Sequence, residues 1–457
     1  MAIKWLIDAS YFVAAILFIL GLKGMSSPVS ARKGIVWAGV GMVLATVVTL
    51  LTPGMGNMLL MIIAIALGGA LAWVSGKRVA MTDMPQMVAI YNGMGGGAAA
   101  AIAAVEFARG EMHGTVVTLL ATLGALIGAV SFSGSVVAWA KLQGVMNKAF
   151  RLPAQNAVNV VLALITLGLG VAIVIAPAID PMLVGAFFVL ALVLGAVITL
   201  PIGGADMPVV ISLFNAFTGL AVGFEGFVMG IPALIIAGIV VGAAGTLLTQ
   251  LMAKAMNRPI SNILFVPMAA VGGGEAVEGE QKEVGAMDAA AMMRYASKVI
   301  IVPGYGMAVA GAQHKVWEMT ELLEEAGVEV VFAIHPVAGR MPGHMNVLLA
   351  EAGVPYDKIF DLEEINADFA QADVALVIGA NDVVNPSART DKSSPIYGMP
   401  ILNADMAQNV IVVKRGKGTG YSGIENALFY KDNTRLLYGS AQQAIAEVIQ
   451  HVKAMSV

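Results

Sequence analysis

The chain has 457 residues, of which 58% are hydrophobic and only 12% are charged, and its formal net charge is −4. Soluble domains carry about 25% charged residues, so this composition excludes a protein that is water-soluble throughout. The small negative charge gives no reason to expect nucleic acid as a partner. There is no cysteine, which excludes disulfides, thiolate metal sites and a cysteine nucleophile. We predict no metal site.

The charges are unevenly distributed along the chain. They are sparse up to Met256 and reach ordinary globular density after Glu275. Residues 260–296 contain glycines and acids without strong periodicity, which is typical of a linker. We therefore predict a membrane domain over residues 1–259, a linker over 260–296 and a soluble domain over 297–457.

The first domain contains about nine stretches that could cross a bilayer, each close to the 20 mainly apolar residues that a membrane helix needs. The boundaries near Pro53-Gly54 and Gly203-Gly204 are the least distinct. The predicted membrane helices are 5–22, 35–52, 56–74, 84–106, 115–139, 158–176, 182–201, 206–224 and 231–252.

Lysine and arginine predict how these helices are oriented, because cytoplasmic loops are enriched in both. One side of the membrane would hold Lys23, Arg32, Lys33, Lys77, Arg78, Lys141, Lys148, Arg151, Lys254 and Arg258. The other side would hold only Lys4 and Arg109. This bias places the N-terminus outside and the soluble domain in the cytoplasm or in the matrix of an organelle.

Small and polar residues stand out within the predicted helices. The run from Gly93 to Ala101 lacks bulky side chains except for Met94, which favours close packing between helices. The polar residues at membrane depth are Asn92, Ser131, Ser133, Ser135, Asp206, Asn215 and Thr218. Such groups either form hydrogen bonds between helices or line a route for ions or protons. Asp206, which precedes Met207-Pro208, could also be a simple helix N-cap.

The soluble domain alternates between predicted strands and helices, which indicates a parallel, doubly wound α/β sheet of the Rossmann-like class. The predicted strands are Lys298 to Val302, Val328 to Ile334, Val374 to Ile378 and Val410 to Val413. The predicted helices are Met307 to Glu325, 342–352, 364–371 and 441–454.

The loops that follow the predicted strands contain the candidate binding residues. Gly304-Tyr305-Gly306 lies between the first strand and its helix, as in a dinucleotide fingerprint, but Val309 replaces the third glycine. Further loops run from His335 to Gly343, from Gly379 to Pro386 and from Gly416 to Tyr421, the last resembling a flexible lid. Because ligands bind beyond the carboxyl ends of parallel strands, we expect all four loops to converge on one site.

The end of the second strand distinguishes NADP from NAD. An NAD site usually has an acid there for the ribose hydroxyls, but this strand ends Ala333-Ile334-His335-Pro336. The 2′-phosphate of NADP requires cations instead, and Lys414-Arg415 at the end of a later strand could supply them. Taken alone, the same pair could be a solvated basic loop.

These motifs together resemble the beta subunit of proton-translocating NAD(P) transhydrogenase over nearly the whole chain. The matching segments are Gly203 to Val210, Pro303 to Ala310, His335 to Arg340, Pro342 to Asn346, Val377 to Asp382, Lys414-Arg415 and Gly420-Tyr421.

The resemblance implies a Re/Si-specific reaction that couples hydride transfer between NAD(H) and NADP(H) to proton movement into the cytoplasm. This chain would bind NADP(H) and form most of the proton path in the inner membrane, surrounded by lipid. No second dinucleotide domain is visible in the sequence, so an alpha subunit would bind NAD(H). The family assembles as a dimer of alpha–beta units.

The resemblance also implies residue roles. Lys414 and Arg415 would hold the 2′-phosphate, Arg340 would approach the pyrophosphate, and Asp382 would lie near the nicotinamide. The other implied cofactor-binding residues are Gly304, Tyr305, Gly306, Val337, Ala338, Gly339, Met341, Pro342, Gly379, Ala380, Asn381, Val383, Gly398, Met399, Gly420, Tyr421, Ser440 and Ala441.

In the membrane, Asp206 and Asn215 match family positions linked to proton conduction. Asn92 departs from the family pattern, because some members have a histidine there and asparagine cannot titrate. Either the partner subunit or another residue of this chain would have to supply the titrating group, and we favour the partner.

Two other functional classes fit the same two-part organisation. One is a channel or secondary transporter with a regulatory nucleotide-binding domain, although the sequence has no evident selectivity-filter motif. The other is an enzyme with a purely structural membrane anchor, which would leave Asn92, Asp206 and Asn215 with no role beyond packing.

Overall fold

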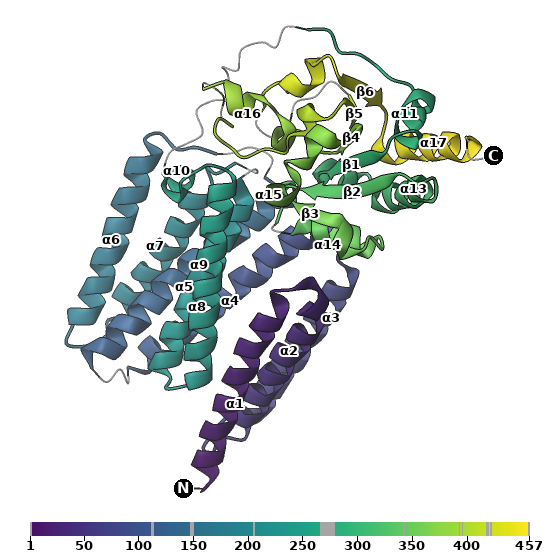
Figure 1. Cartoon of the computed structure of the whole chain (residues 1–457). Helices are drawn as coiled ribbons and strands as arrows, with labels where there is room; N and C mark the ends of the chain where they lie inside the picture. Colours follow the sequence, from purple (N-terminus) through teal and green to yellow (C-terminus); the bar gives the residue numbers. More distant parts are fainter. Residues whose placement is uncertain are drawn as a thin grey trace. The chain divides into compact units, whose positions relative to one another are not determined.

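The structure is a computed structural model that describes residues 2–110, 114–146, 150–203, 206–265, 279–341, 343–392, 394, 396–416, 420 and 423–455. The chain forms two compact units (Figure 1). The first, called here the helical unit, comprises residues 1–202 and 209–249. The second, called the sheet unit, comprises residues 203–208 and 250–457.

The N-terminal part of the chain forms long apolar helices. Within the described residues, nine helices are long and apolar enough to cross a membrane, which confirms the predicted number. They are α1 (Ala2–Met25), α2 (Pro28–Leu50), α3 (Met58–Arg78), α4 (Met84–Arg109), α5 (Thr115–Leu142), α6 (Gln155–Ile175), α7 (Pro181–Thr199), α8 (Met207–Val228) and α9 (Pro232–Ala255).

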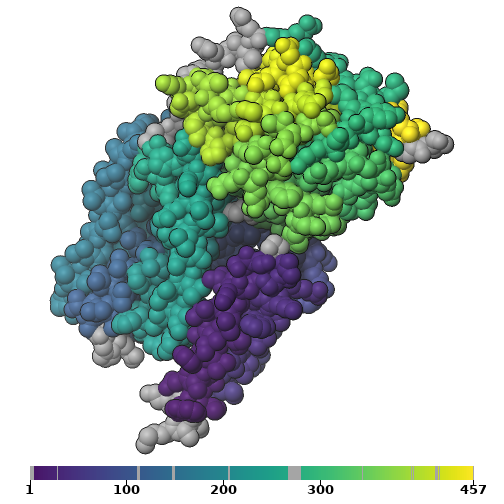
Figure 2. Space-filling view, viewed as in Figure 1, coloured from purple at the N-terminus to yellow at the C-terminus, as the bar shows by residue number. Residues whose placement is uncertain are grey.

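The first three of these helices have apolar outer surfaces. No residue of α3 is buried, and Trp5, Leu59 and Leu71 are each more than two-thirds exposed. In Figure 2 the surface of α1 and α2, in purple, lies open to the viewer. Large contiguous apolar surfaces are rare on water-soluble proteins. These helices therefore suit a hydrocarbon environment, in which every backbone polar group is paired within the helix.

Helices α4 and α5 pack closely through glycine and alanine. A Cβ atom at Gly96 would lie 2.9 Å from the Gly128 carbonyl oxygen, and one at Gly128 would lie 3.0 Å from the Ala100 nitrogen. The two backbones are therefore too close for larger side chains at these positions. This confirms that the small residues between Gly93 and Ala101 serve helix packing.

The sheet unit is built on six parallel strands in the order β3-β2-β1-β4-β5-β6. The strands are β1 (Lys298–Pro303), β2 (Glu329–Ile334), β3 (Ile359–Asp361), β4 (Val374–Ile378), β5 (Asn409–Lys414) and β6 (Thr434–Tyr438). The strand order reverses between β1 and β4, so a crevice is expected where the loops after these two strands diverge. The predicted parallel, doubly wound fold is confirmed.

Helices pack on the sheet of this unit. Those called α11 (Ala286–Arg294), α13 (Gln313–Glu325) and α17 (Ala441–Ala454) pack together, with α13 against β2 and α17 against β5 (Figure 1). The remaining helices are α10 (Ile260–Leu264), α12 (Tyr305–Val309), α14 (His344–Glu351), α15 (Leu362–Ile365) and α16 (Ser387–Thr390). A core cluster joins alternate residues of the strands, such as Ile300, Val377 and Val412, to Phe369 and Leu428.

The structure differs from the sequence-based prediction in several elements. β3 and β6 were not predicted, and α10 and α11 lie within the segment 260–296 that resembled a linker. The predicted helix Met307 to Glu325 is two helices, α12 and α13, because Gly311 has a φ of +63° that ends the first one. The predicted helix over 364–371 consists of the last turn of α15 and a short 3₁₀ turn.

Candidate functional site

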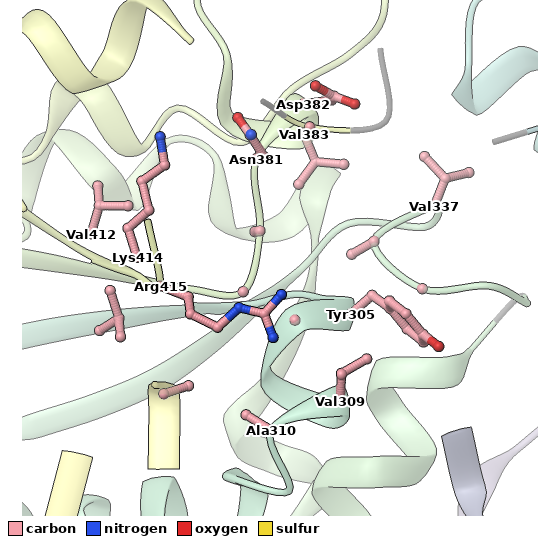
Figure 3. Close-up of a pocket in the computed structure, with 18 of the residues that line it drawn as sticks. Tyr305, Val309, Ala310, Val337, Asn381, Asp382, Val383, Val412, Lys414 and Arg415 are labelled. Atoms are coloured by element: carbon pink, nitrogen blue, oxygen red, sulfur yellow. The ribbon is translucent and has the colours of Figure 1, made fainter. Parts of the chain in front are cut away.

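A pocket of about 930 Å³ lies at the carboxyl ends of the parallel strands (Figure 3). This volume is within the usual range for small-molecule and cofactor sites. The loops after β1, β2, β4, β5 and β6 all contribute to its lining, as the convergence argument predicted.

The turn after β1 packs directly against the turn after β4. The Gly304 amide donates to the Ile378 carbonyl at 2.9 Å, and the Gly306 amide donates to the Gly379 carbonyl at 2.9 Å. A Cβ atom at Gly306 would lie 2.8 Å from the Gly379 Cα atom. Gly379 itself has a φ of +72°, a conformation that favours glycine. The glycines therefore allow two backbone segments to meet at the floor of the pocket.

The loop after β2 is held by a buried histidine. His335 Nε2 lies 2.7 Å from the Pro400 carbonyl oxygen, and the Val337 amide donates to His335 Nδ1 at 3.2 Å. Because a carbonyl can only accept, Nε2 must carry the proton of a neutral ring. Burial lowers the pKa of His335 to about 4, although the Pro400 carbonyl opposes this shift. His335 therefore orders the loop that carries Val337 and Ala338 into the pocket.

Three side chains of neighbouring loops stack beside the pocket. The Arg340 guanidinium lies 4.3 Å from the centre of the Tyr305 ring, and the His344 ring lies 5.9 Å from the Tyr305 ring. Stacking on an aromatic face orients a guanidinium while leaving its edge available for hydrogen bonds. Arg340 is thus positioned on a platform that lines the pocket.

The loop after β4 brings a carboxylate to the pocket. Asn381 and Asp382 both line it, and Asn426 Nδ2 donates to the backbone and side-chain oxygens of Asn381 at 2.9 Å each. A Cβ atom at Gly420 would lie 2.5 Å from Asp382 Oδ1, so the glycine lets the segment after β5 approach this carboxylate. Figure 3 shows Asn381, Asp382 and Val383 following one another along this loop.

Two cations lie at the end of β5. Lys414 Nζ lies 4.3 Å from the centre of the Phe429 ring, and burial lowers the pKa of Lys414 while Glu425 partly offsets the effect. Arg415 is exposed. Neither forms a salt bridge within the described part of the chain. From adjacent positions the two side chains diverge (Figure 3), because successive residues at a strand end point to opposite sides. Both line the pocket.

A helix also begins at the pocket. Ser440 and Ala441 both line it, and the Ser440 hydroxyl accepts a hydrogen bond from the Gln443 amide as the N-cap of α17. α17 has 14 residues, so its N-terminus carries the partial positive charge of a full-length helix. The short α12, with 5 residues, makes the glycine turn after β1 a much weaker helix terminus than the sequence predicted.

Comparison with known proteins gives a consistent result. The family described as NAD(P) transhydrogenase beta subunit matches residues 7–451 of the chain. A protein from Rhodospirillum rubrum named NAD(P) transhydrogenase subunit beta is 48% identical over 458 aligned residues, covering 97% of this chain and 98% of the relative. A second sequence of that name from the same organism aligns with the same values.

The chain belongs to the NAD(P) transhydrogenase beta subunit family. The family name refers to nicotinamide dinucleotides, and the designation beta implies an alpha subunit as partner.

Most of the residues predicted to bind the dinucleotide line one pocket in this transhydrogenase chain. They are Tyr305, Gly306, Val337, Ala338, Gly339, Arg340, Gly379, Ala380, Asn381, Asp382, Val383, Met399, Lys414, Arg415, Gly420, Ser440 and Ala441. Gly304, Met341 and Gly398 are not among the lining residues. Gly304 and Gly398 support the loops instead, through backbone bonds to Ile378 and Ala388. Pro342 and Tyr421 lie outside the described residues.

The sequence-based prediction missed several lining residues. Val309 and Ala310 of the first helix after β1, Ile396, Phe429 and Gly439 also face the pocket. These are ordinary apolar residues or an isolated glycine, so no local pattern identifies them. Phe429 has a clear role in the structure, because its ring lies beside the Lys414 ammonium.

Within the helical unit, a polar cluster joins three helices of the bundle. The cluster consists of Asn92 on α4, Ser131 and Ser135 on α5, and Thr218 on α8. Asn92 Nδ2 donates to the Ser135 hydroxyl at 3.2 Å, the Ser131 and Thr218 hydroxyls lie 2.6 Å apart, and the Thr218 hydroxyl donates to the Asn92 carbonyl at 3.3 Å. The Asn92 side-chain oxygen is buried and has no hydrogen-bond partner within the described chain.

The remaining polar candidates occupy different environments. Ser133 donates only within its own helix, to the Ala129 carbonyl at 3.1 Å and to the Val130 carbonyl at 3.4 Å. Asn215 is half-buried on α8. Asp206, just before α8, accepts hydrogen bonds of 2.7 Å on both carboxylate oxygens from Arg258 Nη1. Asp206 is therefore one member of an ion pair and more than a helix cap.

Proposed function

We propose that this chain is the NADP(H)-binding and proton-conducting beta subunit of a Re/Si-specific transhydrogenase. The complex would couple hydride transfer between NAD(H) and NADP(H) to proton movement across the membrane. The observation that carries the proposal is the pocket at the carboxyl ends of β1, β4 and β5, lined by Lys414 and Arg415 and lacking an acid after β2. Family membership and nine apolar helices in the described chain support it.

The residues of the pocket fit NADP(H). The glycines after β1 and β4 let two backbone turns meet at the floor of the pocket, and the N-terminus of α17 favours a phosphate. Arg415 is exposed and can form two parallel hydrogen bonds to the 2′-phosphate, while the divergent Lys414 adds positive charge at the same strand end. After β2, the neutral His335 stands where an NAD site would place an acid.

In this proposal the other polar residues of the pocket orient the dinucleotide. Arg340, fixed on the Tyr305 ring, approaches the pyrophosphate, and Asp382 lies near the nicotinamide. NADP(H), when bound, supplies or accepts a hydride in direct transfer between two nicotinamide rings. The chain's own contribution is to position one ring and to exclude water from it. Gly416 and Gly420, the described ends of the predicted lid, line the pocket, and residues 417–419 lie outside the described residues.

The polar residues of the membrane helices would conduct the proton. We propose that Asn92, Asn215 and Asp206 lie along this path and that proton occupancy shifts the nucleotide site between an occluded and an open form. The interhelical hydrogen bond of Asn92 and the Asp206–Arg258 ion pair support this idea, because each joins polar groups from two different segments of the chain.

The proposed assembly has an alpha subunit that binds NAD(H). Two alpha–beta units would form a dimer in the lipid of the inner membrane, with the N-terminus of this chain outside and its nucleotide domain in the cytoplasm. The distribution of lysine and arginine between the loops supports this orientation.

The test of NADP(H) selectivity is the double variant Lys414→Ala/Arg415→Ala, measured by calorimetric titration of the assembled complex. Loss of two charge-assisted contacts should weaken NADP(H) binding by about 2–4 kcal/mol, roughly 30- to 1,000-fold. NAD(H) binding should stay unchanged. Equal weakening of both dinucleotides would refute the 2′-phosphate assignment. Glu351→Ala, an exposed change at the end of α14, is the control for handling and assembly.

A further inference from the structure

A buried carboxylate that the sequence-based prediction did not select lies in the membrane helices. Glu225 on α8 is only 1% exposed. Both of its carboxylate oxygens are buried, and neither has a hydrogen-bond partner within the described residues. An ionised carboxylate without partners is very costly in an apolar environment. Glu225 is therefore neutral in this conformation, which means that it holds a proton.

The described surroundings of Glu225 leave room for its carboxyl group, and no described residue places a cation beside it. A Cβ atom at Gly124 on α5 would lie 3.1 Å from Glu225 Cδ, so the absence of a side chain at Gly124 creates the space. An apolar cluster that includes Phe107, Ala121 and Val228 lies on the same helices.

The charged residues of the neighbouring helices do not offer a counter-ion. Glu106 on α4 is the charge that acts electrostatically on Glu225, and it pairs with Arg109 at 3.6 Å. On α5 and α9 the described cations are Lys141 and Lys254, each in the last turn of its helix. On α7, Asp180 caps the first turn by accepting from the Met182 amide. Because no described cation pairs with Glu225, its carboxylate is neutralised by binding a proton.

Helix register places Glu225 in line with the polar cluster. Thr218 and Glu225 are seven residues apart on α8, which is two helical turns, so they share one face about 10 Å apart along the axis. Gly124 and Ser131 have the same spacing on α5. Ser131 contacts Thr218, and Gly124 faces Glu225. The α5–α8 interface therefore contains polar groups at two heights along the helices. The polar cluster lies at one, and the Glu225 carboxyl group lies two turns further along.

We propose that Glu225 is a proton-binding residue of the transmembrane path, at the level between the polar cluster and the C-terminal end of α8. The inference rests on the proposed proton translocation. Asparagine, serine and threonine in the cluster can relay a proton only through water, because none of them titrates at ordinary pH. The ionised carboxylate of Glu225 can accept a proton from water, and the carboxyl group can release that proton to water at a later stage of the cycle. The chain therefore supplies a titrating group of its own despite the asparagine at position 92.

The test uses the complete alpha–beta complex in lipid vesicles. Glu225→Gln keeps the shape of the side chain but cannot bind and release a proton, and Glu225→Asp keeps a shortened titrating group. Asp8→Asn is the matched control, because it removes an exposed carboxylate from α1 and leaves both Glu225 and Glu106 in place. Proton uptake during transhydrogenation is measured together with the infrared carbonyl band of protonated carboxyl groups.

We expect Glu225→Gln to lower proton uptake at least tenfold, to lose one protonated-carboxyl band and to bind NADP(H) as the wild type does. Glu225→Asp should retain part of the uptake, and Asp8→Asn should retain both uptake and band. Wild-type uptake in Glu225→Gln, or an unchanged infrared band, would overturn the inference. A wild-type complex that moves no protons would instead refute the proposed function itself.

Discussion

In the sheet unit, the polar groups of the pocket stand at the ends of parallel strands and are supported by neighbouring loops, whereas in the helical unit they are few and bond across helices. Asn381, for example, receives two hydrogen bonds from Asn426, and His335 is held by Pro400. Asn92 has one side-chain donor bond, and Glu225 has no partner within the described chain. Because many contacts hold the residues of the pocket in place, a single substitution there should weaken dinucleotide binding only partly. In the bundle there are few polar groups, so the loss of one is not compensated by its neighbours.

The largest expected effect on activity is therefore in the membrane path, and the effects that follow concern stability. Asp206→Ala removes the partner of Arg258, and Asn215→Leu removes a polar group from α8. Each should lower proton uptake by roughly tenfold or more, equivalent to about 1.4 kcal/mol, and should alter NADP(H) release. Vesicle proton uptake and stopped-flow release of NADPH measure the two effects.

Ser133→Ala is the matched control for these two variants, because the Ser133 hydroxyl bonds only to carbonyls of its own helix. It should pump protons as the wild type does. If Asp206→Ala and Asn215→Leu left both proton pumping and NADPH release unchanged, the coupling proposal would be wrong. Single polar residues of the bundle would then matter no more for activity than single residues of the pocket.

The next effect concerns His335 and pH. Its pKa is about 4 in the folded protein because of burial, against a model-peptide value of 6.5. The folded state thus binds fewer protons between these values, so stability rises with pH in this window and is constant above pH 6.5. The full difference is about 3 kcal/mol. Hydrogen exchange of the β1 and β2 amides should therefore become faster as the pH falls from 6.5 toward 4, after correction for the intrinsic rate.

His335→Asn should flatten this pH dependence, because asparagine does not titrate. Its stability above pH 6.5 should be lower than that of the wild type, since the bond to the Pro400 carbonyl is disturbed. A His335→Asn variant with the same pH slope as the wild type would show that another group controls acid sensitivity.

The smallest of these effects is at the floor of the pocket. A Cβ atom in Gly304→Ala would lie 2.6 Å from the Ala380 Cα atom, so the two turns must separate, at a cost of about 1–3 kcal/mol. Gly285→Ala is the control, because its Cβ would lie 3.8 Å from Asp288 Oδ2, an ordinary van der Waals contact, and its φ is −79°. Chemical denaturation of the sheet unit should separate the two variants; equal stability would contradict the close packing of the turns.

Much of the site could be predicted from the sequence because parallel strands bring their carboxyl ends to one edge of a sheet. Loops at Gly304, Val337, Gly379 and Lys414 are far apart along the chain but follow strands, so their convergence needs only the fold class. β3 and β6 were harder, since β3 has only three residues and β6 contains Thr434 and Arg435. Short or mixed segments have too little periodicity to distinguish strand from loop.

The sequence by itself determined the two-part organisation, the nine apolar helices, the parallel sheet and the family, because charge density, apolar length and strand–helix alternation are properties of consecutive residues. Only the tertiary structure showed that Lys414 and Arg415 diverge and that Ser131 meets Thr218. It alone also revealed that Glu225 is enclosed without a partner among the described residues. Burial and pairing depend on which helices pack together, and a carboxylate in an apolar helix looks the same in the sequence whether it faces lipid, water or another helix.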